Sequence, residues 1–348
     1  MIVGLMSWPI VAARARRAWH RVLFVVVATL AAAACGDDAP SPVAPTPTPP
    51  AVQPFALQCP ADILGQSTSG APVSIQVPAA TSTGGVLPVT VSCSPAGTPF
   101  PIGSTRVTCG ATDARGSTAS CSFNVNVAPP PLGRTSFLAF GDSMTAGEIT
   151  VPVGTALGED GFPNFRQIVV PAESYPTKLL TLMRTRYFTQ ASQFVVTNAG
   201  LPREWAADGA RRLPGVLTST NPQVLLLLAG ANDLEAVPTS AGVTTGLNGL
   251  LTMVRTARQR GVAVFVGTLP PVRPGGRLSL PTALVQTFND GIRAGAASEG
   301  AVLVDLQAAM AANVTTFIGI DGLHPTEAGY QRMAETFFTA IRTTYEGR

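Results

Sequence analysis

Two regions with different patterns of apolar and turn residues predict the fold class, a small β-sandwich domain followed by an α/β domain with a parallel sheet. In residues 55–128, short β-branched runs alternate with turn residues, a pattern typical of a small antiparallel sandwich. From residue 136 on, short apolar runs alternate with helical patterns. A strand as apolar as 224–229 is buried on both faces, which requires a parallel sheet covered by helices.

Composition allows more than one domain and argues against a nucleic-acid partner. The 348 residues are 46% hydrophobic and 12% charged, enough for a sizeable core. The formal net charge is only +3, and several of the positive charges belong to the N-terminal segment: Arg14, Arg16, Arg17 and Arg21. The rest of the chain therefore has no basic excess that would indicate nucleic-acid binding.

Residues 1–35 have the order of a secretory signal. An arginine-rich start is followed by the apolar run 22–30 and by small residues up to Cys35. The run is short for a membrane-spanning helix, although an uncleaved N-terminal anchor is the alternative. The small residues before Cys35 resemble the lipobox of bacterial lipoproteins, with Ala32 where leucine is usual. This resemblance implies export to the periplasm or cell surface, with a lipid anchor on Cys35.

Two proline-rich stretches separate the predicted domains. Residues 36–54 cannot form a core and are expected to be a stiff, extended tether that holds the following domain away from a membrane surface. Residues 129–135 form a second linker. The sandwich is therefore assigned to 55–128 and the α/β domain to 136–348.

The sandwich contains four of the five cysteines, Cys59, Cys93, Cys109 and Cys121, and Cys35 is the odd one out. An exported module with four cysteines normally forms two disulfides, and lipidation would remove the leftover thiol. A zinc site is the alternative, but the paired close spacing of a zinc ribbon and a nearby histidine are both missing.

Strands are expected in the sandwich at 73–77, 89–93, 105–109 and 122–127. Residues 100–127 resemble the second half of a hyalin-repeat (HYR) domain, an immunoglobulin-like module. The resemblance implies an adhesion or spacer role, with a surface or glycan ligand and no chemistry. We favour pairing Cys59 with Cys121 and Cys93 with Cys109, although four cysteines allow three connectivities and the sequence does not choose among them.

In the α/β domain we expect strands at 136–140, 193–197, 223–229, 262–267 and 301–305 and helices near 175–188, 206–218, 242–260, 282–298 and 326–344. The segment 148–173 is longer than an ordinary connection. Because it lies beside Ser143 in the sequence, we expect a substrate-binding loop or lid there, with a disordered insertion as the alternative.

A nucleophile, a base and an acid can be named from the residues alone. Ser143 follows the first strand at the sheet edge where ligands bind in open α/β folds. A serine needs a base to become a nucleophile, and His20 lies in the targeting segment, which leaves His324. Asp321, three residues earlier, can orient that histidine. Taken singly, each of these residues could instead cap a helix or a turn.

Four blocks occur in the order found in the SGNH hydrolases, or GDSL-type esterases, which this domain resembles: 141–144 (Gly-Asp-Ser-Met), 198–200 (Asn-Ala-Gly), 230–233 (Gly-Ala-Asn-Asp) and 321–325 (Asp-Gly-Leu-His-Pro). Met144 stands where the motif usually has leucine. The resemblance implies a flavodoxin-like three-layer α/β/α domain and a route through an acyl-serine. It also implies an oxyanion hole formed by the Ser143 N–H, the Gly200 N–H and the Asn232 side chain.

The predicted function is hydrolysis of carboxylic esters without a metal or organic cofactor. The substrate is expected to be an acetylated glycan, a lipid or a small ester, and the sequence does not distinguish a carbohydrate acetyl esterase from a lysophospholipase or thioesterase. A catalytically inactive surface-binding or adhesion lipoprotein is the alternative. Trp205, just beyond Gly200, either lines the substrate pocket or only packs.

Overall fold

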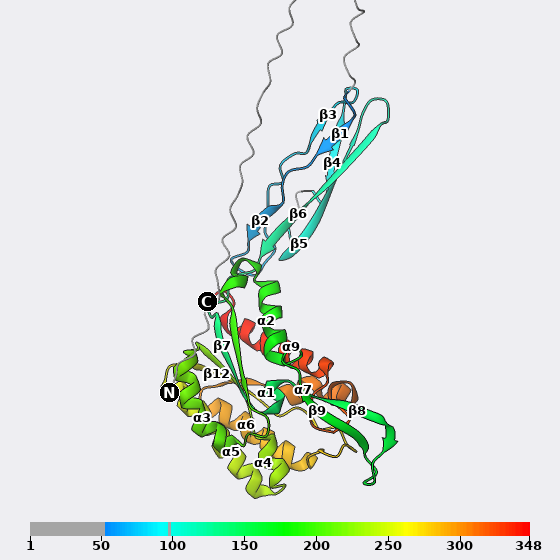
Figure 1. Cartoon of the computed structure of the whole chain (residues 1–348). Helices are drawn as coiled ribbons and strands as arrows, with labels where there is room; N and C mark the ends of the chain where they lie inside the picture. Colours follow the sequence, from blue (N-terminus) through cyan, green and yellow to red (C-terminus); the bar gives the residue numbers. More distant parts are fainter. Residues whose placement is uncertain (1–52, 97–98) are drawn as a thin grey trace, which may run out of the picture. The chain divides into compact units, whose positions relative to one another are not determined.

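The computed structural model describes residues 53–96 and 99–348. The predicted signal segment, Cys35 and most of the first linker lie outside the described residues. Along the described chain, a β-rich region is followed by an α/β region (Figure 1). Within these residues, none of the helices is long and apolar enough to cross a membrane.

The β-rich region has six strands: β1 (Ala56–Gln58), β2 (Ile63–Gln66), β3 (Thr81–Thr83), β4 (Thr90–Ser94), β5 (Gly103–Thr112) and β6 (Thr118–Ala128). The order in the main sheet is β2-β6-β5-β4, and β1 pairs with β3. The expected antiparallel pattern holds for β4, β5 and β6, but β2 runs parallel to β6. The run 73–77 forms a single bridge, from Val73 to Phe100, instead of the expected strand.

Two disulfides connect the strands of this small core. Cys59 is bonded to Cys121 and Cys93 to Cys109, the connectivity favoured from the sequence. Cys93 and Cys109 face each other across β4 and β5, so the second bond joins neighbouring strands. Because all four sulfurs are in disulfides, they are not available as thiolate ligands.

The α/β region is built on a parallel sheet of β7 (Ser136–Gly141), β10 (Val195–Gly200), β11 (Val224–Leu228), β12 (Ala263–Gly267) and β13 (Val302–Val304). Its order, β10-β7-β11-β12-β13, is the flavodoxin-like doubly wound order. Every residue of β11 is buried, as a strand with helices on both faces requires. The five strands that the sequence predicted for this sheet are confirmed, with ends that differ by at most three residues.

The long helices are α2 (Tyr175–Arg186), α3 (Ala206–Thr220), α5 (Ser240–Gln259), α6 (Thr282–Ser298) and α9 (Glu327–Tyr345), all of which the sequence predicted. Short ones are α1 (Ser143–Ala146), α4 (Ala231–Ala236), α7 (Leu306–Met310) and α8 (Val314–Phe317), with 3₁₀ turns η1 (Phe188–Gln193) and η2 (Ala311–Asn313). Helix α2 packs on α9, where the rings of Tyr175 and Phe337 stack at 5.0 Å, while α5 packs between α3 and α6 (Figure 1).

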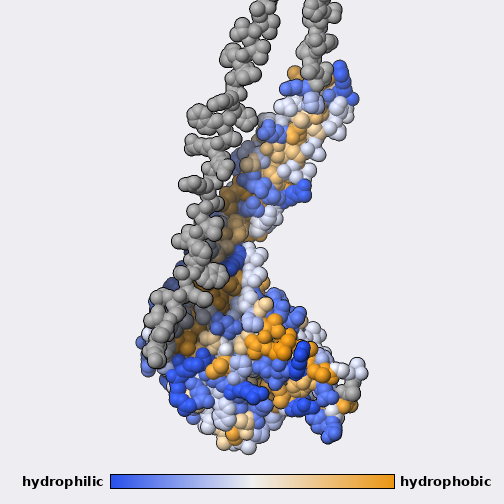
Figure 2. All heavy atoms as spheres, viewed as in Figure 1, coloured by the Kyte–Doolittle hydropathy of each residue, from blue (hydrophilic) through white to orange (hydrophobic). Residues whose placement is uncertain are grey.

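The segment expected to be a loop, a lid or a disordered insertion is an ordered hairpin. It consists of β8 (Glu148–Leu157) and β9 (Pro163–Val169), which pair antiparallel around a turn in which Gly161 donates to Gly158 O. Its β-branched residues form strands, although the glycines and prolines among them suggested a loop. Val153, Leu157 and Val169 are exposed, and Figure 2 shows hydrophobic and hydrophilic residues interspersed on this part of the surface.

Gly230, at the end of β11, is a position that only glycine fits. Its φ is 114°, and a Cβ there would lie 2.2 Å from the Phe288 ring. We expect Gly230→Ala to lower the free energy of unfolding by roughly 2–4 kcal/mol, since strain and overpacking add. Gly215→Ala on α3, where a Cβ meets nothing within 4 Å, is the matched control and should stabilise by up to about 1 kcal/mol. Urea unfolding of both variants checks this, and equal stabilities would contradict it.

Candidate active site

The candidate site lies where β7 and β11 end. β7 stops at Gly141, and Asp142 caps the following helix α1, its Oδ1 accepting from the Met144 N–H at 3.0 Å. Ser143 is the first residue of that helix, so its own N–H has no partner within the helix. Asn232 sits in the first turn of α4, directly after β11. The parallel sheet therefore brings these two blocks to one edge.

The third block is a turn that precedes α9. Neighbouring backbone holds it in place: the Leu278 N–H donates to Asp321 O at 2.7 Å, and the Gly319 N–H donates to His324 O at 2.8 Å. Thr326 then caps α9 by accepting from the Gly329 N–H. These hydrogen bonds fix both ends of the turn independently of the side chains of Asp321 and His324.

Three buried side chains from these blocks form one hydrogen-bonded chain. Ser143 Oγ lies 2.9 Å from His324 Nε2, and His324 Nδ1 lies 2.7 Å from Asp321 Oδ2. The three residues are 5%, 4% and 0% exposed, respectively. Both distances fit the tautomer in which Nδ1–H donates to the carboxylate and Nε2 accepts from the serine hydroxyl.

The environment of the pair favours an ionised Asp321 and a basic His324. Burial raises the pKa of Asp321, but hydrogen bonds from His324, Thr150 and the Leu323 N–H outweigh it and hold that pKa below the ordinary value. Burial lowers the pKa of His324. The hydrogen bond and charge of Asp321, with the charge of Glu148, more than reverse this, so its pKa lies above 6.5.

Ser143 and His324 open onto a cavity of about 410 Å³. Asn232 is on its wall, and one of the two N–H groups of the Asn232 amide donates to Glu204 O at 3.0 Å. The other residues that line the cavity are Glu148, Gln167, Arg203, Trp205, Glu235, Ala236 and Leu278. A hydroxyl hydrogen-bonded to an imidazole in a cavity of this size is an arrangement that can attack a bound ester.

Residues 139–332 match the model of the GDSL-like lipase/acylhydrolase family, which is more than half of the 348-residue chain. This chain belongs to that family. Residues 48–127 match the HYR domain model. The protein is thus an esterase or acylhydrolase preceded by an HYR domain.

The chain is also similar to individual proteins and solved structures. Esterase TesA of Pseudomonas aeruginosa is 25% identical over 164 residues, which cover 47% of this chain and 77% of that protein. A crystal structure of a lipase/acylhydrolase from Enterococcus faecalis has a TM-score of 0.47 at 22% identity and covers 62% of this chain and 98% of that one. A crystal structure of TesA has a TM-score of 0.44 at 22% identity, with 60% and 98% covered.

In this GDSL-family esterase Gly200, the residue expected to supply an oxyanion donor, is not among the residues that line the cavity. Its N–H donates to Asn198 Oδ1 at 3.0 Å. A Cβ there would lie 2.1 Å from the Ala146 N, so the glycine permits the close approach of β10 to α1. Gly200 therefore has a packing role between these two elements.

Arg203 is on the cavity wall instead. Its φ of 66° is left-handed, which is uncommon for a residue other than glycine and concentrates at functional sites. No described residue accepts a hydrogen bond from its backbone N–H. The sequence did not predict this role for Arg203, because an arginine gives no sign of a left-handed backbone conformation. Of the two roles considered for Trp205, the structure agrees with lining the pocket, because Trp205 lines the cavity and is 42% exposed.

The hairpin adds two residues that the sequence did not single out. Thr150 Oγ1 donates to Asp321 Oδ2 at 2.5 Å, and Gln167 Nε2 lies 3.2 Å from His324 Nδ1. Both belong to the segment predicted as a loop or lid. The only available signal was the position of that segment directly after the serine.

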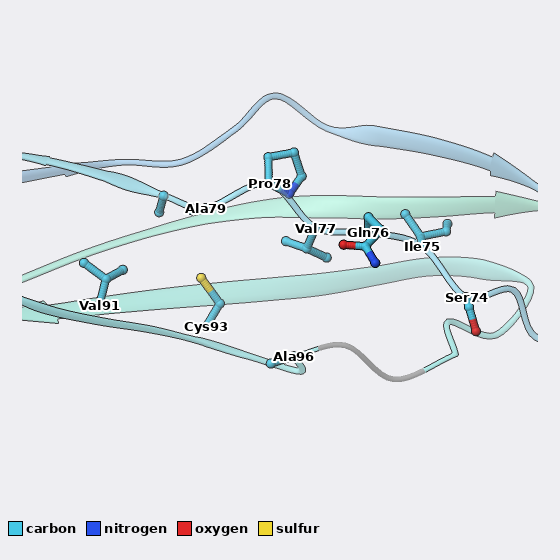
Figure 3. Close-up of a pocket in the computed structure, with 10 residues that line it drawn as sticks. Ser74, Ile75, Gln76, Val77, Pro78, Ala79, Val91, Cys93 and Ala96 are labelled. Carbon is cyan, nitrogen blue, oxygen red and sulfur yellow. The ribbon is translucent and has the colours of Figure 1, made fainter.

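A cavity of about 420 Å³ also occurs in the HYR domain. Figure 3 shows the stretch from Ser74 to Ala79 running alongside the strand that carries Val91 and Cys93. The lining side chains are neutral, and Cys93 is in a disulfide, so this cavity offers no acid or base for catalysis.

Asp142, which is fully buried and precedes Ser143, should make the stability of the protein depend on pH. Burial raises its pKa from 3.8 to about 7, so the folded protein holds a proton that the unfolded chain releases above pH 4. The free energy of unfolding should therefore fall as pH rises from about 4 to above 7. We expect Asp142→Asn, which keeps the Oδ1 acceptor, to lose this contribution and to gain stability over the wild type at pH 8 but not at pH 4. Urea unfolding at both pH values measures the difference, and a pH-independent difference would refute the assignment.

Proposed function

We propose that the protein is a serine esterase in which Ser143 is the nucleophile, His324 the general base and Asp321 the acid that orients the base. One observation carries the proposal: the continuous chain from Ser143 Oγ through His324 to Asp321, which opens onto the cavity. The family membership of the chain supports the same chemistry.

The reaction follows from this chain of groups. Ser143 Oγ attacks the ester carbonyl carbon as His324 Nε2 takes its proton, and a tetrahedral intermediate forms. The intermediate collapses to an acyl-serine, and His324 returns the proton to the departing alcohol. Water then attacks the acyl-serine with His324 again as base, which releases the carboxylic acid and restores Ser143. Asp321 remains ionised throughout and stabilises the charged imidazole.

The negative charge on the intermediate needs donors that are fixed in advance. We assign this role to the Ser143 N–H and to the second N–H of Asn232, the one that Glu204 does not use. The Arg203 N–H is our candidate for the donor first expected from Gly200, because Arg203 lines the cavity and this N–H has no described acceptor.

The cavity lining favours a short acyl group on a polar alcohol, such as an acetylated glycan. Only Trp205, Ala236 and Leu278 are apolar among its ten residues. A long acyl chain gains about 0.8 kcal/mol for each buried CH₂ group, and this wall offers little apolar surface for that. The exposed Trp205 ring can cover the apolar face of a sugar while polar neighbours bind its hydroxyls. With two carboxylates, Glu148 and Glu235, against the single guanidinium of Arg203, the wall disfavours the phosphate of a lysophospholipid or of a phosphorylated thioester carrier.

The first test is turnover of p-nitrophenyl acetate, butyrate and octanoate. We expect kcat/KM to fall from acetate to octanoate and Ser143→Ala to reduce turnover to background. Asn232→Ala should lower kcat by about 10²–10³ while the protein stays folded, because it removes one oxyanion donor. Asn248→Ala, at an exposed position on α5, is the matched control and should change nothing.

Two results would count against these assignments. Turnover that survives in Ser143→Ala would remove the nucleophile and with it the proposed route. A preference for octanoate over acetate would leave the route intact but would exclude the short-acyl specificity.

We further propose that the protein is exported and anchored to a membrane by a lipid on Cys35, with the HYR domain as an adhesion or spacer module. The lipobox-like sequence supports this, and so do the two disulfides, which persist in oxidising compartments. Mass spectrometry of the mature N-terminus should find a diacylglyceryl group on Cys35. An unmodified end created by cleavage at another residue would overturn the anchor.

A further inference from the structure

The β8–β9 hairpin contacts the candidate catalytic residues from outside the parallel sheet. It begins at Glu148, immediately after helix α1 and the nucleophile (Figure 1). Tyr330 of α9 donates its buried hydroxyl to Glu148 O at 2.6 Å, which fixes the start of the hairpin. Thr150, two residues on, lies next to the turn that contains Asp321, since a Cβ on Gly319 of that segment would be 3.4 Å from the Thr150 side chain.

Asp321 accepts four hydrogen bonds, and one of them comes from this hairpin. Its Oδ1 accepts from the N–H groups of Leu323 and His324 at 3.0 and 3.1 Å, both within the turn. Its Oδ2 accepts from His324 Nδ1 and from Thr150 Oγ1. Among these donors, Thr150 alone comes from another element, and it bonds the same oxygen as the catalytic imidazole.

We propose that Thr150 is a positioning residue for the esterase reaction, which holds Asp321 Oδ2 in line with His324 Nδ1. The proposal rests on the proposed function of the Ser143, His324 and Asp321 chain. A threonine suits the role because its β-branched side chain has few χ1 states, so the hydroxyl direction is fixed by the strand. A carboxylate held by donors on both oxygens cannot rotate away from the imidazole when the imidazole becomes charged.

Gln167, the second hairpin residue at the site, does not offer the same support. In the tautomer that the reaction needs, Nδ1 carries a hydrogen that it donates to Asp321. The Gln167 Nε2, 3.2 Å away, is itself a donor and cannot bond that hydrogen. Thr150 is therefore the hairpin residue whose hydrogen bond agrees with the catalytic state.

A structural role, in which Thr150 only anchors the hairpin, differs from a positioning role in what other variants of the hairpin should do. The far end of the hairpin is anchored independently, because Arg277 forms an ion pair with Asp160 at 2.7 Å and its guanidinium lies 5.3 Å from the centre of the Phe165 ring. Asp160→Asn weakens that anchor without touching Asp321. Thr155→Val makes the same chemical change as Thr150→Val at an exposed position of β8.

The test compares kcat, KM and pH profiles for p-nitrophenyl acetate in the full-length protein. We expect Thr150→Val to lower kcat on the order of tenfold with KM unchanged, because a hydrogen bond to a charged group is lost. Thr150→Ser should recover most of the rate. Thr155→Val and Asp160→Asn should resemble the wild type.

The acid limb of the pH profile gives a readout that a structural role would not move. Without the Thr150 donor, Asp321 Oδ2 leaves its line with His324 Nδ1 and stabilises the charged imidazole less, which lowers the pKa of His324. The acid limb of kcat/KM in Thr150→Val should therefore move to lower pH, by about half a unit. The titratable groups that face His324 are Asp321 in its own turn, Glu148 on β8 and Asp142 before α1, and Thr150→Val replaces none of them.

Several outcomes would overturn the proposal. Wild-type kcat and pH profile in Thr150→Val, with Ser143→Ala inactive, would refute positioning and leave the esterase route standing. An equal loss in Asp160→Asn, or a loss in Thr150→Val with an unmoved acid limb and a lower melting temperature, would mean that Thr150 only anchors the hairpin. Activity that persists in Ser143→Ala would instead refute the route on which the proposal rests.

Discussion

The hydrogen bond between Ser143 and His324 joins residues 181 positions apart, so it can form only when the α/β domain is folded. Forming it requires β7 between β10 and β11 in the sheet, so that the serine lies at the carboxyl edge. It also requires the turn before α9 to return to that edge. The contacts of Leu278 and Gly319 with the turn backbone are what hold it there.

Burying this chain of polar groups costs free energy unless each group has a hydrogen-bond partner. A serine, a histidine and an aspartate that are nearly inaccessible to water would each destabilise the fold without partners. Together they satisfy one another, and Asp321 is saturated by four donors. The same four hydrogen bonds that stabilise the buried carboxylate also fix the direction of the imidazole, so stability and the proposed catalysis depend on one network.

The β8–β9 hairpin contributes contacts to the candidate site from outside the parallel sheet. Sheet edges and loops supply the groups that react, yet Thr150 and Gln167 reach the same residues from a two-stranded ribbon outside the sheet. Glu148 and Gln167 also line the cavity. The hairpin therefore links the support of Asp321 to the wall that a substrate would contact, with Arg277 joining its far end to the segment that braces the turn.

The sequence by itself determined the five strands of the parallel sheet and the long helices, because apolar runs and helical periodicity are local signals of burial. It also singled out Ser143, Asp321 and His324, since residue type limits which groups can act as nucleophile, base or acid, and the family resemblance added Asn232. Tertiary structure alone decided that Gly200 packs against α1, that Arg203 turns into the cavity and that Thr150 bonds Asp321. These features depend on which backbone groups come close across the fold, and no local pattern of residues encodes that proximity.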